Sequence, residues 1–206
     1  ETGKKAYYSF LQAREKMPRN VYNVSTLVGV SRYAAKVSSM AVANGGDTMF
    51  LGTNDGNLMR FQCRQDTAFS AGSGSFECFL SDTQKLSKDK KPIRELYVID
   101  SLHVMLCLVG IKGEGSMLVC DLRQNGDPSP IHECKGVRCF GVKESDNLLY
   151  VCTKRKIYVF SWEGVSFVLQ QELPLSHTPQ CCAVLPADAA GSGGAGDGGG
   201  GGSGGG

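Results

Sequence analysis

The sequence predicts an all-β fold, a partial β-propeller with about three four-stranded blades plus the first strand of a fourth. One observation behind this prediction is a unit that occurs three times: an apolar run, a tight polar turn and a second apolar run. Each copy also follows a further strand-like stretch and precedes a weaker one. The units begin about 44 to 56 residues apart, and four strands recurring at such an interval are typical of propeller blades.

Apolar hairpins form the centre of each expected blade. Val, Ile, Leu, Phe and Tyr fill the runs, whereas Gly, Asn, Asp and Lys fill the turns, as in strands joined by tight turns. The three hairpins are expected to join Thr48–Gly52 to Leu58–Phe61, His103–Gly110 to Met117–Leu122, and Leu148–Cys152 to Ile157–Trp162.

Flanking strands complete the blades. We expect opening strands at Val37–Ala43, Ile93–Ile99 and Val137–Val142, closing strands at Phe76–Leu80, Ile131–Cys134 and Phe167–Leu173, and the start of a fourth blade at Gln180–Leu185. A β-sandwich of evenly spaced hairpins would share most of these features. The recurrence of a four-strand unit, rather than of hairpins alone, favours the propeller.

Three regions follow from this pattern. Residues 1–20 form an N-terminal extension, in which Lys4–Met17 is either a short helix or an unstructured lead-in. Residues 21–186 form the partial propeller, and the β-prone stretch Val21–Val30 could supply a strand to the last, absent blade. Residues 187–206 are rich in Gly and are expected to form a flexible linker or low-complexity tail.

Three blades and one strand are too few to close a ring, because propellers generally have about four to eight blades. An open arc would leave sheet edges and blade faces uncovered, which natural propellers avoid by closing. We therefore expect residues 1–186 to be part of a longer polypeptide.

The charge balance argues against a strong electrostatic partner. The net charge is +2 and the pI is about 8.1, so we expect no strong field that attracts nucleic acid or anionic lipid. Arg64–Lys91 is polar and predicts a long loop around one short strand. Its end, Lys85–Lys91, holds four Lys and one Asp, which fits either a phosphate or lipid-headgroup contact or, more simply, a solvated loop.

Cysteine usage indicates a reducing compartment. The chain has nine Cys, an odd number that does not fit a complete disulfide framework. Several lie inside apolar strands, where free Cys behaves as a small buried hydrophobic residue: Cys107, Cys120, Cys139 and Cys152. Together with the lack of a secretory leader pattern, this predicts a cytoplasmic protein.

No catalytic, cofactor or metal residue is predicted. Gly110–Gly115 superficially resembles a nucleotide-binding loop but lies between two strands of one hairpin, where a turn is the simpler interpretation. The best metal candidate is His132 and Cys134 with Cys139, but this spacing matches no strong zinc pattern. Cys181 and Cys182, on one expected strand, would point to opposite faces.

The sequence of the repeats resembles that of the citron-homology (CNH) domain family. The resemblance is carried by Lys90–Gly110 and Ser116–Leu122, and it continues through Gly136–Phe140, Leu149–Cys152 and Lys156–Trp162. Upstream, Lys36–Val42 and Leu51–Leu58 are similar to the first blade of that domain. Within the family the chain looks most like the N-terminal propeller of the vacuolar protein sorting subunits of the HOPS and CORVET tethering complexes.

The resemblance implies a function without catalysis. It implies an interaction module of a vesicle-tethering subunit in endosome-to-vacuole trafficking, with other tethering subunits and a Rab-type small GTPase as partners. It also implies a cytoplasmic location, peripheral to late endosome or vacuole membranes through those partners. The alternative within the family is a regulatory scaffold of a germinal-centre-type kinase or a Rho guanine-nucleotide exchange factor.

Two further alternatives lie outside the family. An unrelated propeller scaffold would fit the strand pattern, although no Gly-His and Trp-Asp pair recurs as in WD repeats. An enzyme built on a propeller would need a convergent polar cluster, which the sequence does not display.

Overall fold

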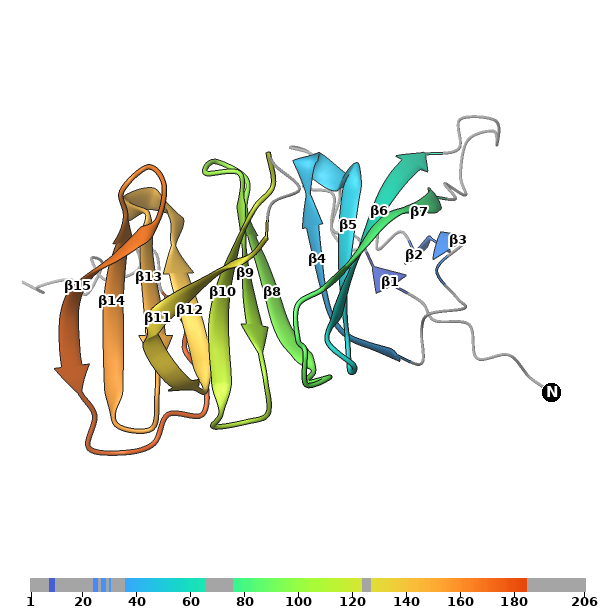
Figure 1. The fold of residues 1–206 in the computed structure, drawn as a ribbon. Coiled ribbons are helices and arrows are strands. Elements are labelled where there is room, and N and C mark those ends of the chain that lie inside the picture. The colour runs from blue at the N-terminus through green and yellow to red at the C-terminus, as the bar shows by residue number, and fades with distance from the viewer. Residues whose placement is uncertain are drawn as a thin grey trace, which may run out of the picture.

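A computed structural model of the chain describes residues 8–9, 24–25, 27–28, 30, 36–65, 76–123 and 127–184. The fold is all-β, and three sheets stand side by side as consecutive blades of a partial β-propeller (Figure 1). The predicted fold class is therefore confirmed.

Each blade is an up-and-down sheet of four consecutive strands. The first blade contains β4 (Val37–Ala43), β5 (Thr48–Thr53), β6 (Asn57–Gln65) and β7 (Phe76–Lys85). The second contains β8 (Ile93–Ile99), β9 (Val104–Val109), β10 (Gly115–Asp121) and β11 (Ser129–Val137). The third contains β12 (Cys139–Lys143), β13 (Leu148–Cys152), β14 (Lys156–Trp162) and β15 (Phe167–Pro174).

β9, the second strand of its blade, is buried on both faces, which explains why its sequence is continuously apolar. All six residues of β9 are buried. Because successive side chains of a strand point to opposite faces, Leu106 and Leu108 enter the core shared with the third blade. Met105 and Cys107 enter the core shared with the first blade. One strand thus contributes to two inter-blade cores.

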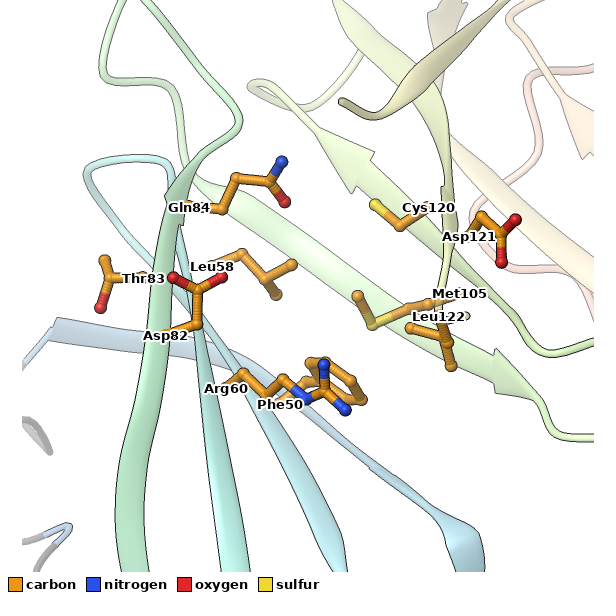
Figure 2. A pocket seen from close by; sticks show the side chains of 10 residues that line it. All are labelled: Phe50, Leu58, Arg60, Asp82, Thr83, Gln84, Met105, Cys120, Asp121 and Leu122. Carbon is orange, nitrogen blue, oxygen red and sulfur yellow. The ribbon is translucent and has the colours of Figure 1, made fainter. Parts of the chain in front are cut away.

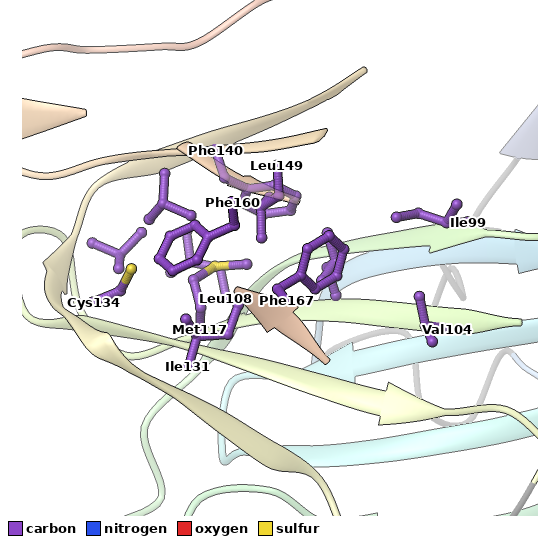
Figure 3. Packing of buried hydrophobic residues seen from close by; sticks show 13 residues of the cluster. Ile99, Val104, Leu108, Met117, Ile131, Cys134, Phe140, Leu149, Phe160 and Phe167 are labelled. Atoms are coloured by element: carbon purple, nitrogen blue, oxygen red, sulfur yellow. The ribbon is translucent and has the colours of Figure 1, made fainter. Parts of the chain in front are cut away.

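The core between the second and third blades is the largest (Figure 3). Phe160, Leu149 and Met117 are each fully buried in it. Tyr97 packs its ring edge against Phe140 at 6.5 Å between centroids, so aromatic contacts join the two sheets as well. A third core covers the other face of the first blade and includes Met49, Leu51 and Phe61.

Neighbouring blades also meet through their opening strands. Ser38 and Ser39 each donate a hydrogen bond from Oγ to the carbonyl of Ile93, at 2.8 and 2.7 Å. Between the second and third blades, Arg94 similarly donates a hydrogen bond from Nη2 to the carbonyl of Arg138 at 2.9 Å. These bonds fix each blade to the start of the next.

Several strand boundaries differ from the predicted ones. Val137 closes the second blade as the last residue of β11, and the third blade opens at Cys139. Arg138 is the single residue between the two strands, and Gly136 has a positive φ just before it. In the first blade β6 and β7 are longer than expected, because polar residues such as Asp82 and Thr83 continue the pairing along this outer hairpin.

The predicted strand at Gln180–Leu185 is wrong for its described part, because 180–184 forms no strand. The segment nevertheless lies against the third blade, since a Cβ on Gly141 would meet Cys182 and Val184 at 3.0 and 3.1 Å. Leu185 and the predicted tail 187–206 lie outside the described residues.

The N-terminal residues pair differently from the expectation. β3 (Leu27–Val28) adds to the first blade, parallel to β7, and does not serve a last blade. β1 (Tyr8–Ser9) pairs with β2 (Val24–Ser25), so neither alternative for Lys4–Met17, a short helix or an unstructured lead-in, holds at Tyr8 and Ser9. The rest of that stretch lies outside the described residues.

Candidate interaction surfaces

A cleft of about 330 Å³ lies between the first and second blades; we call it cleft A (Figure 2). Phe50, Leu58 and Met105 form its apolar floor. Polar residues surround the floor: Arg60, Asp82, Thr83, Gln84 and Asp121. An apolar floor within a polar surround is the usual composition of a site that binds a protein or peptide side chain.

Arg60 gives cleft A its particular chemistry. Its guanidinium carbon lies 5.9 Å from the centroid of the Phe50 ring, within cation–π range. Asp82 is its cross-strand partner on β7. The Nε–H group of Arg60 is buried and donates no hydrogen bond within the described part of the chain, so it is an unsatisfied donor beneath the cleft.

A second cleft of about 690 Å³ lies between the second and third blades; we call it cleft B. Trp162 and Phe167 line it and pack edge to face at 5.0 Å between centroids. Arg123 and Asp127 also line it. Aromatic residues and Arg are enriched where protein partners bind most strongly.

Val165 marks the mouth of cleft B. It lies in the turn between β14 and β15, and its side chain is 88% exposed. A fully exposed Val beside an aromatic cleft is a ready contact for an apolar side chain of a partner. Sequence reasoning placed Trp162 at the end of a strand but could not locate this cleft, because its walls come from two blades.

Polar contacts also join neighbouring blades. Tyr97 donates a hydrogen bond to a Glu144 carboxylate oxygen at 2.6 Å, joining the second blade to the third. This bond, followed by burial, raises the pKa of Tyr97 to about 12. The backbone N–H of Asn44 likewise donates to Asp100 at 3.2 Å, joining the first blade to the second.

The expectation that cysteines serve as buried hydrophobic residues is confirmed. Seven are free and buried: Cys63, Cys78, Cys107, Cys120, Cys134, Cys139 and Cys152. Two pairs are in contact across strands, Cys63 with Cys78 at 2.9 Å and Cys107 with Cys120 at 3.7 Å between sulfur atoms. A hydrogen bond to Cys120, and then burial, raises the pKa of Cys107 well above its usual value, which keeps that thiol protonated and unreactive.

The third blade carries a thiol cluster that sequence reasoning did not anticipate. Cys139 and Cys152 face each other across β12 and β13, and Cys182 lies beside them from the segment after β15. Its hydrogen bond with Cys152 lowers the pKa of Cys182 to about 7 and raises that of Cys152. Cys181, its neighbour in sequence, is exposed.

Of the metal candidates, the structure describes the side chains of Cys134 and Cys139. Cys134 and Cys139 are both buried and belong to different blades, at β11 and β12. Across the described ranges, no three His, Cys, Asp or Glu side chains gather closely enough to hold a metal ion. The described part of the chain also contains no helix long and apolar enough to cross a membrane.

The architecture and its two clefts define the class of this chain: a partial β-propeller with concave sites between successive blades. No family model matches the chain, and no curated protein sequence matches it. Its fold is similar to the WD40 domain of Neurospora crassa Pan2, with a TM-score of 0.51 and 16% sequence identity. The match covers 74% of this chain and 42% of that domain, so the chain spans less than half the length of this structural neighbour.

Proposed function

We propose that the chain is a non-catalytic protein-interaction module of a vesicle-tethering subunit that acts in endosome-to-vacuole or lysosome trafficking and membrane fusion. Its partners are other subunits of the tethering complex and a Rab-type small GTPase, and these partners bring it to late endosome or vacuole membranes from the cytoplasm. Nucleic acid is not among its partners. The resemblance of Lys90–Gly110 and of Lys156–Trp162 to CNH-domain strands supports this assignment.

Cleft B is the observation that supports binding most directly. Its volume is typical of a site that receives side chains from a partner. The aromatic pair of Trp162 and Phe167 offers a rigid apolar wall, whereas Arg123 and Asp127 offer charged contacts at its edge. Such a site recognises an apolar anchor with polar neighbours, and it needs no reacting group.

A capture experiment with the whole chain tests the proposal. The immobilised chain is incubated with purified tethering subunits and with a late-endosomal Rab loaded with GTP, and bound protein is quantified. We expect capture by the wild type and a loss of about tenfold for Val165→Asp, because a charge at the mouth of an apolar contact costs roughly 1–2 kcal/mol. Val168→Asp is the matched control, since Val168 is 37% exposed and lies outside cleft B.

The outcomes separate the two functions within the CNH family. Capture of tethering subunits that depends on Val165 supports the proposal. Failure of both tethering subunits and Rab to bind contradicts it. If cytosolic capture instead recovers kinase-cascade proteins or Rho GTPases, the regulatory scaffold becomes the better assignment.

A further inference from the structure

The loops of this fold separate into two groups at opposite ends of the blades. Up-and-down strands send alternate loops to alternate ends, and equivalent strands of neighbouring blades run in the same direction. Hydrogen bonds confirm the grouping at one end: Gly110 N–H donates to the Pro92 carbonyl at 2.9 Å, and Lys112 Nζ donates to Gln180 at 3.0 Å. This end lies at the bottom of Figure 1.

Basic residues outnumber acidic ones at the lower end. Loop 86–92 carries three Lys and one Asp, and the turn 153–156 reads Thr-Lys-Arg-Lys, whereas the other two turns add the acidic residues Asp55 and Glu114. Lys88, Lys90, Lys154 and Arg155 are exposed. Lys156 forms an ion pair with Glu172 at 2.6 Å, whereas the structure as described gives these four side chains no ion pair.

The opposite end is acidic. Its loops carry Asp47, Asp100, Glu144, Asp146 and Glu163, all exposed. The described cations near this end are few, and one of them, Lys143, is paired with Asp146. The net charge of +2 is therefore the sum of two ends of opposite charge. The electrostatic field in front of either end is stronger than this sum suggests.

An apolar side chain projects within the basic end. Ile111 lies in the turn between β9 and β10 and is 51% exposed; the same turn carries the exposed residues Lys112 and Glu114. Ile111 belongs to none of the three cores. Its side chain can therefore contact another surface without loss of packing inside the protein. Exposed aliphatic groups surrounded by Lys and Arg are the composition of surfaces that lie against the headgroups of a bilayer.

We infer that the basic end is a membrane-contact surface that binds anionic lipid headgroups directly, with Ile111 entering the interface between headgroups and acyl chains. This inference goes beyond the proposed function, in which membrane association runs through protein partners, and it stands without any particular partner. The acidic end faces away from the bilayer in this orientation, because like charges repel.

Two other anionic partners fit the surface less well. The loops of the basic end line neither cleft A nor cleft B, so these clefts offer no pockets there for the side chains of an acidic peptide. The loops 86–92, 110–114 and 153–156 contain no aromatic residue, whereas single-stranded nucleic acid is generally bound on stacked aromatic side chains. A bilayer requires only a broad charged face and a small apolar insertion.

Vesicle binding by the whole chain tests the inference. The chain is sedimented with phosphatidylcholine vesicles that either contain or lack phosphatidylserine. We expect binding only to the anionic vesicles, and we expect it to weaken as the NaCl concentration rises from about 0.1 M to about 1 M, because the screening length falls from about 10 Å to about 3 Å.

Paired variants locate the contact. Lys154→Gln with Arg155→Gln should weaken vesicle binding about 30-fold, since each basic residue near an anionic surface contributes about fivefold. Arg64→Gln with Lys143→Gln removes the same charge at the acidic end and should leave binding unchanged. Each double variant is accepted only if its melting temperature matches that of the wild type.

A second pair of variants tests the apolar contact made by Ile111. Ile111→Ser should weaken binding about fivefold, because a half-exposed Ile gains only part of its transfer energy. Phe79→Ser is the control, since Phe79 is similarly exposed, at 54%, but lies on β7 away from the basic end.

The following results would overturn the inference. They are absence of binding to anionic vesicles, equal losses for both charge pairs, or preferential binding of RNA or an acidic peptide by the same residues. If the capture experiment with tethering subunits and Rab failed, only the proposed protein partners would be refuted. The membrane inference would stand, because Val165 lies at the acidic end.

Discussion

Gly52→Ala is the substitution whose cost the structure specifies best. Gly52 lies in β5, where the first blade meets the opening strand of the second. A Cβ added there would clash with Ser39 Oγ and would lie 2.7 and 2.8 Å from Ile93 Cγ2 and Cβ. Ser39 donates a hydrogen bond to the Ile93 carbonyl, and Ile93 is fully buried. Neither residue can therefore move without breaking contacts between the first and second blades.

The expected cost is about 2 kcal/mol. Overpacking of a core contact costs about 1–3 kcal/mol, and loss of the bond between Ser39 and Ile93 costs about 0.5–1.5 kcal/mol. Against this, Ala lowers the entropy of the unfolded chain and stabilises the folded state by about 0.4–1 kcal/mol. The steric and hydrogen-bond terms therefore outweigh the entropic one.

Urea unfolding followed by the fluorescence of the single Trp measures this change. With an m-value of about 2 kcal/mol per M, the midpoint should fall by about 1 M. Gly141→Ala is the control: its Cβ would meet Cys182 and Val184 at 3.0 and 3.1 Å, but these lie in a segment without strand pairing that can shift. An unchanged or raised midpoint for Gly52→Ala would refute the argument that the contact between these two blades is closely packed.

Three further changes probe the thiols, the aromatic core and the link between blades. Because the pKa of Tyr97 is raised to about 12 by its hydrogen bond to Glu144, its contribution to stability is complete below about pH 10 and is lost as the pH rises towards 12. The difference in melting temperature between wild type and Tyr97→Phe should therefore shrink over that range, and a constant difference would contradict it. The lowered pKa of Cys182, about 7, predicts rapid alkylation by iodoacetamide at pH 7.5, measured by peptide mass spectrometry. Cys152→Ser should slow this reaction, and an unaffected rate would remove Cys152 as the cause. Phe160→Ala should lower the free energy of unfolding by about 3–5 kcal/mol, since Phe160 is fully buried between two blades; a loss under 1 kcal/mol in urea unfolding would mean that the third blade is only loosely attached.

The strands of the blades could be predicted because their pattern is local. The second strand of each blade is apolar on both faces, and its turns carry the residues that turns require, as in β9 and β13. The boundary between β11 and β12 could not be placed to the residue, because Val137 and Cys139 are both apolar and only Arg138 separates the two strands. The strand expected at Gln180–Leu185 failed for a related reason: strand pairing depends on a neighbour that the local pattern does not reveal.

The clefts could not be predicted, because each is assembled from separate blades. Arg60 in the first blade and Met105 in the second are far apart in sequence, yet both line cleft A. Nothing local to Arg60 distinguishes it from other surface Arg residues. The same holds for Trp162 and Arg123 in cleft B. The cysteine cluster likewise depends on the path of the chain after β15, which places Cys182 beside Cys152.

The charge separation, in contrast, could have been found from the sequence. Once four-strand blades are assumed, every second loop belongs to the same end, so the charges of alternate loops can be summed without a structure. The loops 86–92 and 153–156 fall in one group, and the loops at Asp100 and at Glu144–Asp146 fall in the other. The total charge of +2 conceals this grouping, and it led to the expectation that no strong field exists.

The two proposed surfaces are compatible because of this same alternation. A bilayer held at the basic end leaves cleft B facing the opposite direction, since Val165 lies in a loop of the acidic end. A membrane and a protein partner could then be bound at once, which is the geometry that a tether requires. If the Lys154 and Arg155 double variant lost vesicle binding but kept partner capture, and Val165→Asp did the reverse, the two ends would act independently.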